Sequence, residues 1–218
     1  MFGFGRAPSF FDEVCYIGTG SATTQTHNLG VAPELLIIKD RTNASAAGGW
    51  NTWTTGFVIG ASNNEYVALN TTNAKQDKNS SEFWNSSYPT ASVFGIGNSI
   101  FVNESGSKYV AYLFATCAGV SKVGSYTGTG TTLQINCGFT GGARFVLIKK
   151  TSASSNWFVW DTARGMVSGT DNMIPWNTTT AQANADSVYT IATGFQLLAS
   201  PSADVNTSGA SYIFLAIS

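Results

Sequence analysis

The chain contains 218 residues, of which 43% are hydrophobic and only 11% charged, and its formal net charge is -1. This composition excludes a disordered chain, which combines low hydrophobicity with high net charge, and the eleven basic residues form no patch that could hold nucleic acid through its phosphates. Because the sequence has no apolar run of about 18 residues and no signal-peptide pattern at its start, we expect neither a membrane span nor export by a leader.

Four phenylalanines lie near the N-terminus among glycines and a proline: Phe2, Phe4, Phe10 and Phe11. So many aromatic side chains are unusual in a free tail. We expect residues 1–10 to form an arm, and these phenylalanines to dock it into another protein or into the body of the fold.

Short strands separated by turns rich in glycine, serine and asparagine are predicted next. The runs at residues 35–38 and 145–148 are apolar without interruption, which is typical of strands buried on both faces. The segment 157–160 should place Trp157 on one face of its strand and Trp160 on the other, because side chains alternate along a strand.

The sequence repeats itself along nearly its whole length. Four blocks of the first half return in the second half in the same order, and they are residues 16–20 and 126–130, 35–39 and 145–149, 69–72 and 176–179, and 103–110 and 206–213. The offset falls from 110 to 107 and then to 103, which places small deletions in the connecting loops of the second copy. Such self-similarity indicates an internal duplication.

We therefore expect an all-β protein of two tandem, homologous β-sandwich-like modules, residues 11–116 and 117–218, preceded by the short N-terminal arm. The join at residues 117–119 is too short for a flexible tether, so the modules should pack against each other. Each copy should close with a strand that follows a Ser-Gly turn. The best candidate for a helix is the segment 181–188.

Several blocks resemble a known kind of repeat. Residues 10–20, followed by residues 26–39 with His27 and Glu34, resemble a repeat domain of predicted tail-fibre and other virion proteins of bacteriophages, many of them marine. That pattern runs from a GTG turn through H-x-L-G-x-x-P-E-hydrophobic-K and L-N-T-T-x-A to a closing N-x-S-G-x-x-Y-V-A-Y. The resemblance covers essentially all residues after about residue 9.

The resemblance implies a non-enzymatic structural protein of a phage virion, of tail-fibre or attachment type. It also implies synthesis in the host cytoplasm, a place on the tail or surface of the particle, and a homo-oligomer, with a trimer favoured. The arm would contact other virion proteins, and the outward loops would meet a host cell-surface glycan or protein. A capsid or tail decoration protein without a receptor role stays open as an alternative, and so does a glycan-degrading tailspike enzyme.

No catalytic residue, cofactor or metal ligand set is expected. His27 is the only histidine, and its counterpart in the second copy is Cys137. A lone histidine cannot supply a set of histidine ligands, and no G-x-S-x-G motif accompanies it, so we expect a structural histidine bonded to a turn backbone. Cys15, Cys117 and Cys137 are odd in number and show no CxxC spacing, so we expect free thiols.

The twelve acidic residues form no recognisable catalytic pair, which the glycan-degrading alternative would need. Asp161 and Arg164 frame a turn, which Asp161 is expected to close by a bond to the backbone. The turns at 18–20 and 128–130 lack the lysine and the helix of a phosphate loop, and we expect them to be hairpin turns.

Outward loops are the remaining candidates for recognition, because recognition usually lies in loops on a rigid sheet scaffold. Long loops are predicted around residues 43–53, 80–88 and 166–175. The side chains that could hold a sugar there are Trp50, Trp53, Trp84, Tyr88 and Arg164. A place in the core is the alternative for the tryptophans.

Overall fold

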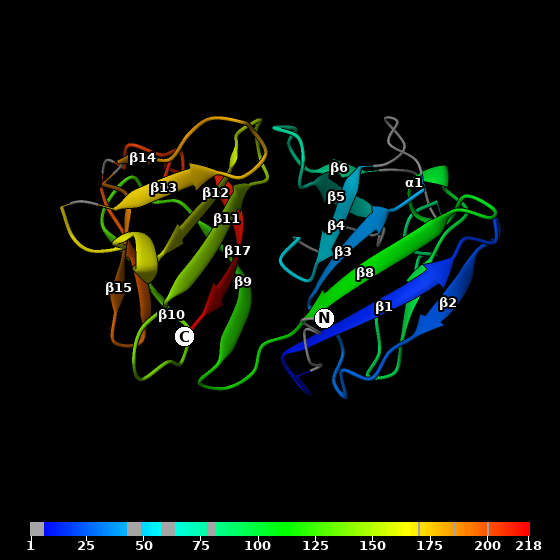
Figure 1. Cartoon of the computed structure of the whole chain (residues 1–218). Coiled ribbons are helices and arrows are strands. Elements are labelled where there is room, and N and C mark those ends of the chain that lie inside the picture. The colour runs from blue at the N-terminus through cyan, green and yellow to red at the C-terminus, as the bar shows by residue number, and fades with distance from the viewer. Residues whose placement is uncertain are drawn as a thin grey trace. The chain divides into compact units, whose positions relative to one another are not determined.

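The computed structural model describes residues 7–42, 49–57, 64–77, 82–169, 171–184, 186–199 and 201–218. They fold almost entirely into antiparallel strands, which confirms the all-β, sandwich-like class (Figure 1). Contacts group them into two compact units. The first reaches to Ala68 and includes Gln76–Ala115, and the second consists of Leu69–Lys75 and Thr116–Ser218.

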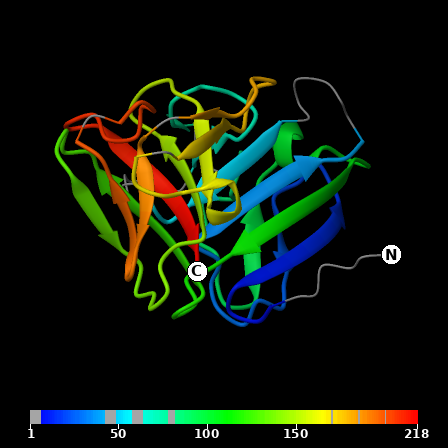
Figure 2. The ribbon, with the colours of Figure 1, turned by 60° about the vertical axis from the view of Figure 1, so that its left-hand side comes forward.

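The first unit contains a six-stranded sheet in the order β1-β8-β3-β4-β5-β6 and a two-stranded sheet, β2-β7. Figure 2 shows β8 in green between the dark blue β1 and the lighter blue β3. The bounds of the elements are β1 Phe11–Ile17, β2 Thr23–Thr26, β3 Leu35–Asp40, β4 Trp50–Thr54, β5 Glu65–Ala68, β6 Gln76–Asp77, β7 Val93–Ile96, the single-turn helix α1 Ile100–Asn103 and β8 Lys108–Phe114.

The second unit contains a six-stranded sheet in the order β14-β13-β12-β11-β17-β9 and a three-stranded sheet, β10-β16-β15. In Figure 1, β11 lies between β12 and β17. The bounds are β9 Ser121–Thr127, β10 Leu133–Asn136, β11 Phe145–Lys150, β12 Trp157–Asp161, the 3-10 turn Thr162–Arg164, β13 Asn172–Pro175, β14 Ala183–Asn184, β15 Val188–Ile191, β16 Gly194–Leu197 and β17 Ser211–Ile217.

The two large sheets have the same strand order. The two orders become identical when each strand of the second unit is matched with one of the first: β9 with β1, β17 with β8, β11 with β3, β12 with β4, β13 with β5 and β14 with β6. The small sheets correspond through β2 with β10 and β7 with β16, and β15 is an addition in the second copy. Each copy of the sequence repeat therefore builds the same sheet.

The core of the second unit lies between its two sheets. Val146, Phe158 and Trp160 point inward from the large sheet and pack with Phe195 and Leu197 of the small sheet. The opposite faces of the same strands are also buried, since Trp157 on β12 is only 2% exposed. The uninterrupted apolar runs are thus buried on both faces, as predicted, and Trp157 and Trp160 lie on opposite sides of their strand.

Two features differ from the expectations. The helix expected at 181–188 does not form in the described part of that segment, where Ala183–Asn184 form β14 and Val188 begins β15. Buried Asp171 accepts hydrogen bonds from the backbone N–H groups of Ser187 and Val188, and this favours an extended chain over a helical turn there. In addition, residues 69–75, which the sequence assigned to the first module, group with the second unit.

Candidate functional site

The turns at residues 18–20 and 128–130 are corners of the sandwiches, and the expectation of hairpins was wrong. β1 pairs with β8, whereas β2 pairs with β7. In the second copy, β9 pairs with β17 and β10 with β16. Consecutive strands therefore belong to different sheets, and each turn carries the chain from one sheet to the other.

A buried asparagine holds the corner of the second copy. Asn206 is only 1% exposed. Its Oδ1 accepts a hydrogen bond from the backbone N–H of Thr129 at 2.9 Å, and its Nδ2 donates to the carbonyls of Thr131 and Leu198, both at 2.7 Å. The backbone N–H of Gly130 also donates to the Asn206 carbonyl at 2.9 Å. One side chain therefore ties both ends of the corner to the segment that follows β16.

Asn103 does the same in the first copy. Its Oδ1 accepts from the backbone N–H of Thr19 at 2.8 Å, and its Nδ2 donates to the carbonyls of Ser21 at 2.7 Å and Gly97 at 2.6 Å. We call Asn103 and Asn206 with these three hydrogen bonds the asparagine clamps. A buried amide whose oxygen and both N–H groups are bonded fixes a corner far better than a solvated one, because an unmade bond in the interior is costly.

The first glycine of each GTG turn is required by a close backbone approach. A Cβ atom at Gly18 would lie 2.0 Å from the carbonyl oxygen of Glu104, and one at Gly128 would lie 2.3 Å from that of Thr207. Backbone atoms cannot move aside as a flexible side chain can. The last glycine has a different reason, since Gly130 has a φ of 69°, which side chains other than glycine rarely adopt.

A pair of stacked tyrosines lies beside each clamp. Tyr126 stacks on Tyr212 with ring centroids 4.9 Å apart, and Tyr16 stacks on Tyr109 at 5.0 Å. The Tyr126 hydroxyl donates to the Val205 carbonyl at 2.7 Å. Burial raises the pKa of Tyr126 and of Tyr16 well above 10, so both rings stay neutral and act as packing groups.

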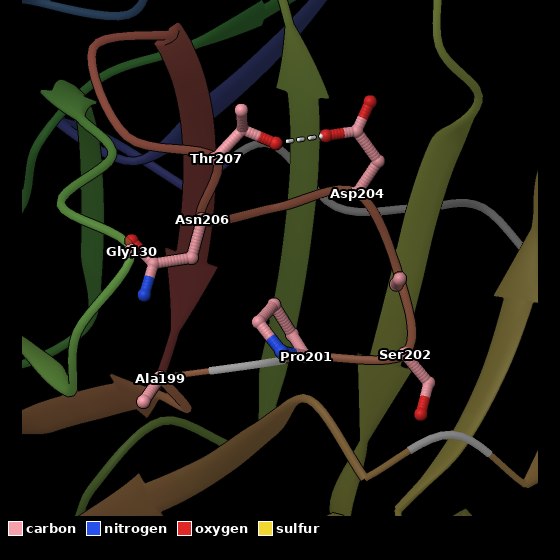
Figure 3. A pocket seen from close by; sticks show the side chains of 8 residues that line it. Gly130, Ala199, Pro201, Ser202, Asp204, Asn206 and Thr207 are labelled. Carbon is pink, nitrogen blue, oxygen red and sulfur yellow. Dashed lines mark hydrogen bonds between the residues drawn. The ribbon is translucent and has the colours of Figure 1, made fainter.

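An open pocket of about 370 Å³ lies beside the second clamp (Figure 3). Its lining comes from the second corner and from the connection between β16 and β17, and consists of Gly130, Ala199, Pro201, Ser202, Ala203, Asp204, Asn206 and Thr207. In the first copy the corresponding connection forms α1, and Phe101 on that helix stacks on Phe83 at 5.7 Å. The pocket belongs to the connection that differs between the copies.

Asp204 is the charged residue of the pocket lining, and its charge is compensated. Its carboxylate accepts from Lys150 Nζ at 3.1 Å and from the Thr207 hydroxyl at 2.7 Å, the bond drawn in Figure 3. Burial acts to raise the pKa of Asp204, but the hydrogen bonds from Thr207 and Lys150 outweigh it and lower the pKa. An ionised, paired carboxylate can accept hydrogen bonds from a ligand, but it is a poor general acid.

His27 bonds the backbone with both ring nitrogens, as expected of a structural histidine. Nδ1 accepts from the backbone N–H of Leu29 at 3.2 Å, and Nε2 lies 3.1 Å from the Thr90 carbonyl. This pair of partners requires the neutral ring with its hydrogen on Nε2. Burial lowers the pKa of His27, which favours the same neutral form.

Two of the predicted sugar-binding side chains are in contact, since the rings of Trp53 and Tyr88 lie edge to face with centroids 6.4 Å apart. Trp53 and Trp84 are 3% and 2% exposed, and Trp84 Nε1 donates to the Glu65 carbonyl at 2.9 Å, so both rings belong to the interior of the first unit. Trp50 stacks on Tyr112, with centroids 6.2 Å apart.

Tyr88 is exposed, whereas Arg164 lies in the second unit. Arg164 forms an ion pair with Asp161, whose Oδ1 also accepts from the Arg164 backbone N–H at 2.9 Å. This confirms the turn expected there, closed by a bond from Asp161 to the backbone. Arg164 therefore has a structural partner already.

The aromatic residues of the expected arm are partly described. Phe11 begins β1 opposite Phe114, with ring centroids 5.0 Å apart, and Phe10 packs on Phe114 at 6.2 Å. These two rings thus contact the body of the fold, which was one of the two expected places. Phe2 and Phe4 lie outside the described residues.

Sequence reasoning did not find the asparagine clamps. Asn103 and Asn206 head the same repeated block, and the identity of the residue in both copies was the available signal. Asparagine is also one of the residues most often found in turns, and a place in a turn was a sufficient explanation for its repetition. Only the coordinates show that the side chains point inward.

Comparison with known proteins gives a single result. A family model described as a domain of unknown function (DUF7483) matches residues 6–218. No curated protein and no solved structure matches the chain. Within the described ranges, no helix is long and apolar enough to cross a membrane, and no three or more His, Cys, Asp or Glu side chains gather as a metal site would require.

Proposed function

The chain belongs to this family, the domain of unknown function DUF7483, and we propose that the protein is a non-catalytic structural component of a bacteriophage particle, of tail-fibre or attachment type. The virion setting comes from the resemblance of residues 10–39 and their repeats to predicted phage tail-fibre proteins. The structure supports the non-catalytic part of the proposal.

The observation that carries this part is the contrast between what the two copies share and what they do not. Both copies keep the asparagine clamp and the stacked tyrosines. The reactive side chains differ, since the counterpart of His27 is Cys137 and the counterpart of Asp204 is Phe101. A duplicated module that retains its packing groups and not its reactive groups fits a scaffold better than an enzyme.

The particle setting is tested by labelling purified phage with an antibody raised against the chain and imaging the label by electron microscopy. We expect the label at a fixed place on the tail or on the particle surface, and we expect the purified, labelled chain to bind host cells. A chain found in the infected cell but absent from purified particles would overturn the proposal.

The non-catalytic part has its own test. The purified chain is incubated with host polysaccharide and the soluble products are analysed for released sugar. We expect none. Release that is lost on changing Asp204→Asn, with the folded state retained, would assign an enzymatic role to the pocket and contradict the proposal.

A further inference from the structure

The pocket beside the second clamp lies at the position where the two copies differ most in chemistry. All of its lining residues belong to the second unit. At the position of Asp204 the first copy has Phe101, whose ring packs on Phe83. The pocket volume of about 370 Å³ lies within the roughly 300–1,000 Å³ that is typical of sites for small molecules. A position that packs a ring in one copy therefore carries a carboxylate beside an open pocket in the other.

The carboxylate of Asp204 is held in place by three donors. Its Oδ1 accepts from the Thr207 hydroxyl at 2.7 Å, from Lys150 Nζ at 3.1 Å and from the Tyr212 hydroxyl at 3.3 Å. Among the described residues, its Oδ2 accepts from Lys150 Nζ alone, at 3.1 Å. Because a carboxylate oxygen accepts about two hydrogen bonds, Oδ1 is fully used and Oδ2 keeps room for one more donor. An acceptor that is already held in place loses little freedom when a ligand binds.

The rest of the lining is largely apolar. Ala199, Pro201 and Ala203 contribute carbon atoms to it. In Figure 3 the Pro201 ring and the hydrogen bond between Thr207 and Asp204 lie on opposite sides of the pocket. A ligand in the pocket therefore meets a hydrogen-bond acceptor on one side and an apolar surface on the other.

The charges at the pocket select a neutral ligand. Asp204 is the charged residue of the lining, and it would repel an anion. A cation would have to compete with Lys150, which already bonds both carboxylate oxygens. The group that fits Oδ2 is a neutral donor such as a hydroxyl. A sugar ring combines hydroxyl groups on its rim with C–H groups on its face, and these match the two sides of the pocket.

We propose that this pocket binds one ring of a neutral saccharide, with a hydroxyl donating to Asp204 Oδ2 and the C–H face of the ring against Pro201. The inference rests on the attachment role proposed above and gives that role a class of ligand. Since an open pocket leaves part of the ring in water, a single sugar should bind with a dissociation constant in roughly the millimolar range. Many copies of the chain on one particle would hold a repeating polysaccharide more tightly.

Nuclear magnetic resonance of the full, nitrogen-15-labelled chain tests the proposal. The probes are the methyl glycosides of glucose, galactose, mannose, rhamnose and N-acetylglucosamine. We expect at least one of them to shift the backbone amide signals of Gly130, Ala203 and Asp204 in a saturable way. The anionic sugar glucuronate should bind at least about tenfold more weakly than the best neutral sugar. The proposal is overturned if none of the five neutral sugars gives a saturable shift, or if the shifts lie only outside the pocket.

Two variants of the pocket make the test specific. Asp204→Asn keeps the size of the side chain but removes the charged acceptor, and it should weaken binding by about tenfold or more. Ala199→Leu enlarges an exposed residue of the lining, and it should weaken binding by filling the pocket. The matched control Ala181→Leu changes an exposed alanine outside the lining and should bind like the native chain. Near-ultraviolet circular dichroism checks that each variant is folded. Equal affinities of the native chain and both pocket variants would contradict the assigned site.

The outcome is separable from that of the particle test. A chain that is found on the particle but binds no sugar would overturn this inference alone. A chain that binds sugar in the pocket but is absent from purified particles would overturn the proposed function and leave the binding site.

Discussion

Asn103 and Asn206 make the same set of hydrogen bonds in the two copies. Each Oδ1 accepts from the central threonine of a GTG turn, Thr19 at 2.8 Å and Thr129 at 2.9 Å, and each Nδ2 donates to two carbonyls. The corners that join the two sheets of each unit therefore depend on one side chain per copy.

Replacing a clamp residue should destabilise its unit. The change Asn206→Ala leaves one backbone N–H and two carbonyls, all in partly buried hydrogen bonds, without their partner, and we expect a loss of about 3 kcal/mol in the free energy of unfolding. The control is Asn184→Ala, at an exposed position. Urea unfolding followed by tryptophan fluorescence measures both variants. Equal unfolding midpoints in the two variants would show that the clamp carries no stability.

The close approach at the corner gives a second prediction. A methyl group at Gly128 meets the Thr207 carbonyl oxygen, whereas one at Gly141 meets nothing within 4 Å. We expect Gly128→Ala to lower the free energy of unfolding by about 2 to 3 kcal/mol, as overpacking does. Gly141→Ala should change it by less than about 0.5 kcal/mol. A thermal unfolding scan of both proteins decides the point, and similar midpoints would argue against the close approach.

The sequence predicted the fold class from local patterns and from the repeat. The apolar run of β11 and the alternation of Trp157 and Trp160 depend only on neighbouring residues, and these predictions were confirmed. The turn at 128–130 was misassigned because glycine and threonine also suit a hairpin, and only long-range pairing shows that β9 and β10 belong to different sheets.

The candidate site was less accessible to sequence reasoning. The pocket depends on the path of the β16–β17 connection, which has no periodic pattern, and the clamp depends on a partner 77 residues away. Tryptophans on strands suit both a core and a sugar site, and burial alone separated these roles for Trp53 and Trp84.

Lys149 should make the stability of the second unit depend on pH. Burial lowers its pKa from 10.5 to about 8. Between these values the unfolded state binds more protons than the folded state, so stability should rise with pH from about 8 towards 10. The variant Lys149→Met should lose this rise, and the exposed control Lys108→Met should keep it. The urea concentration at the midpoint of unfolding is measured for both variants at about pH 7.5 and about pH 9.5, near the two ends of this pH range. An unchanged pH dependence in Lys149→Met would contradict the assignment.

His27 should make the stability of the protein depend on pH in the acidic range. Burial lowers its pKa from 6.5, although the bond to the Thr90 carbonyl acts in the opposite direction. The unfolded chain therefore takes up a proton on His27 first, and stability is lost as the pH falls below about 6.5. Because the chain has one histidine, the imidazole signal in a proton NMR titration reports this group alone. A midpoint at or above 6.5 would contradict the neutral, backbone-bonded ring.

The structure of the whole particle, determined by electron cryomicroscopy, tests the central proposal most directly. We expect density on the tail or the outer surface that fits the two β units, each with its pair of sheets. A structural role in the virion would be contradicted if no density of the particle fitted the chain and the protein of purified particles did not include it.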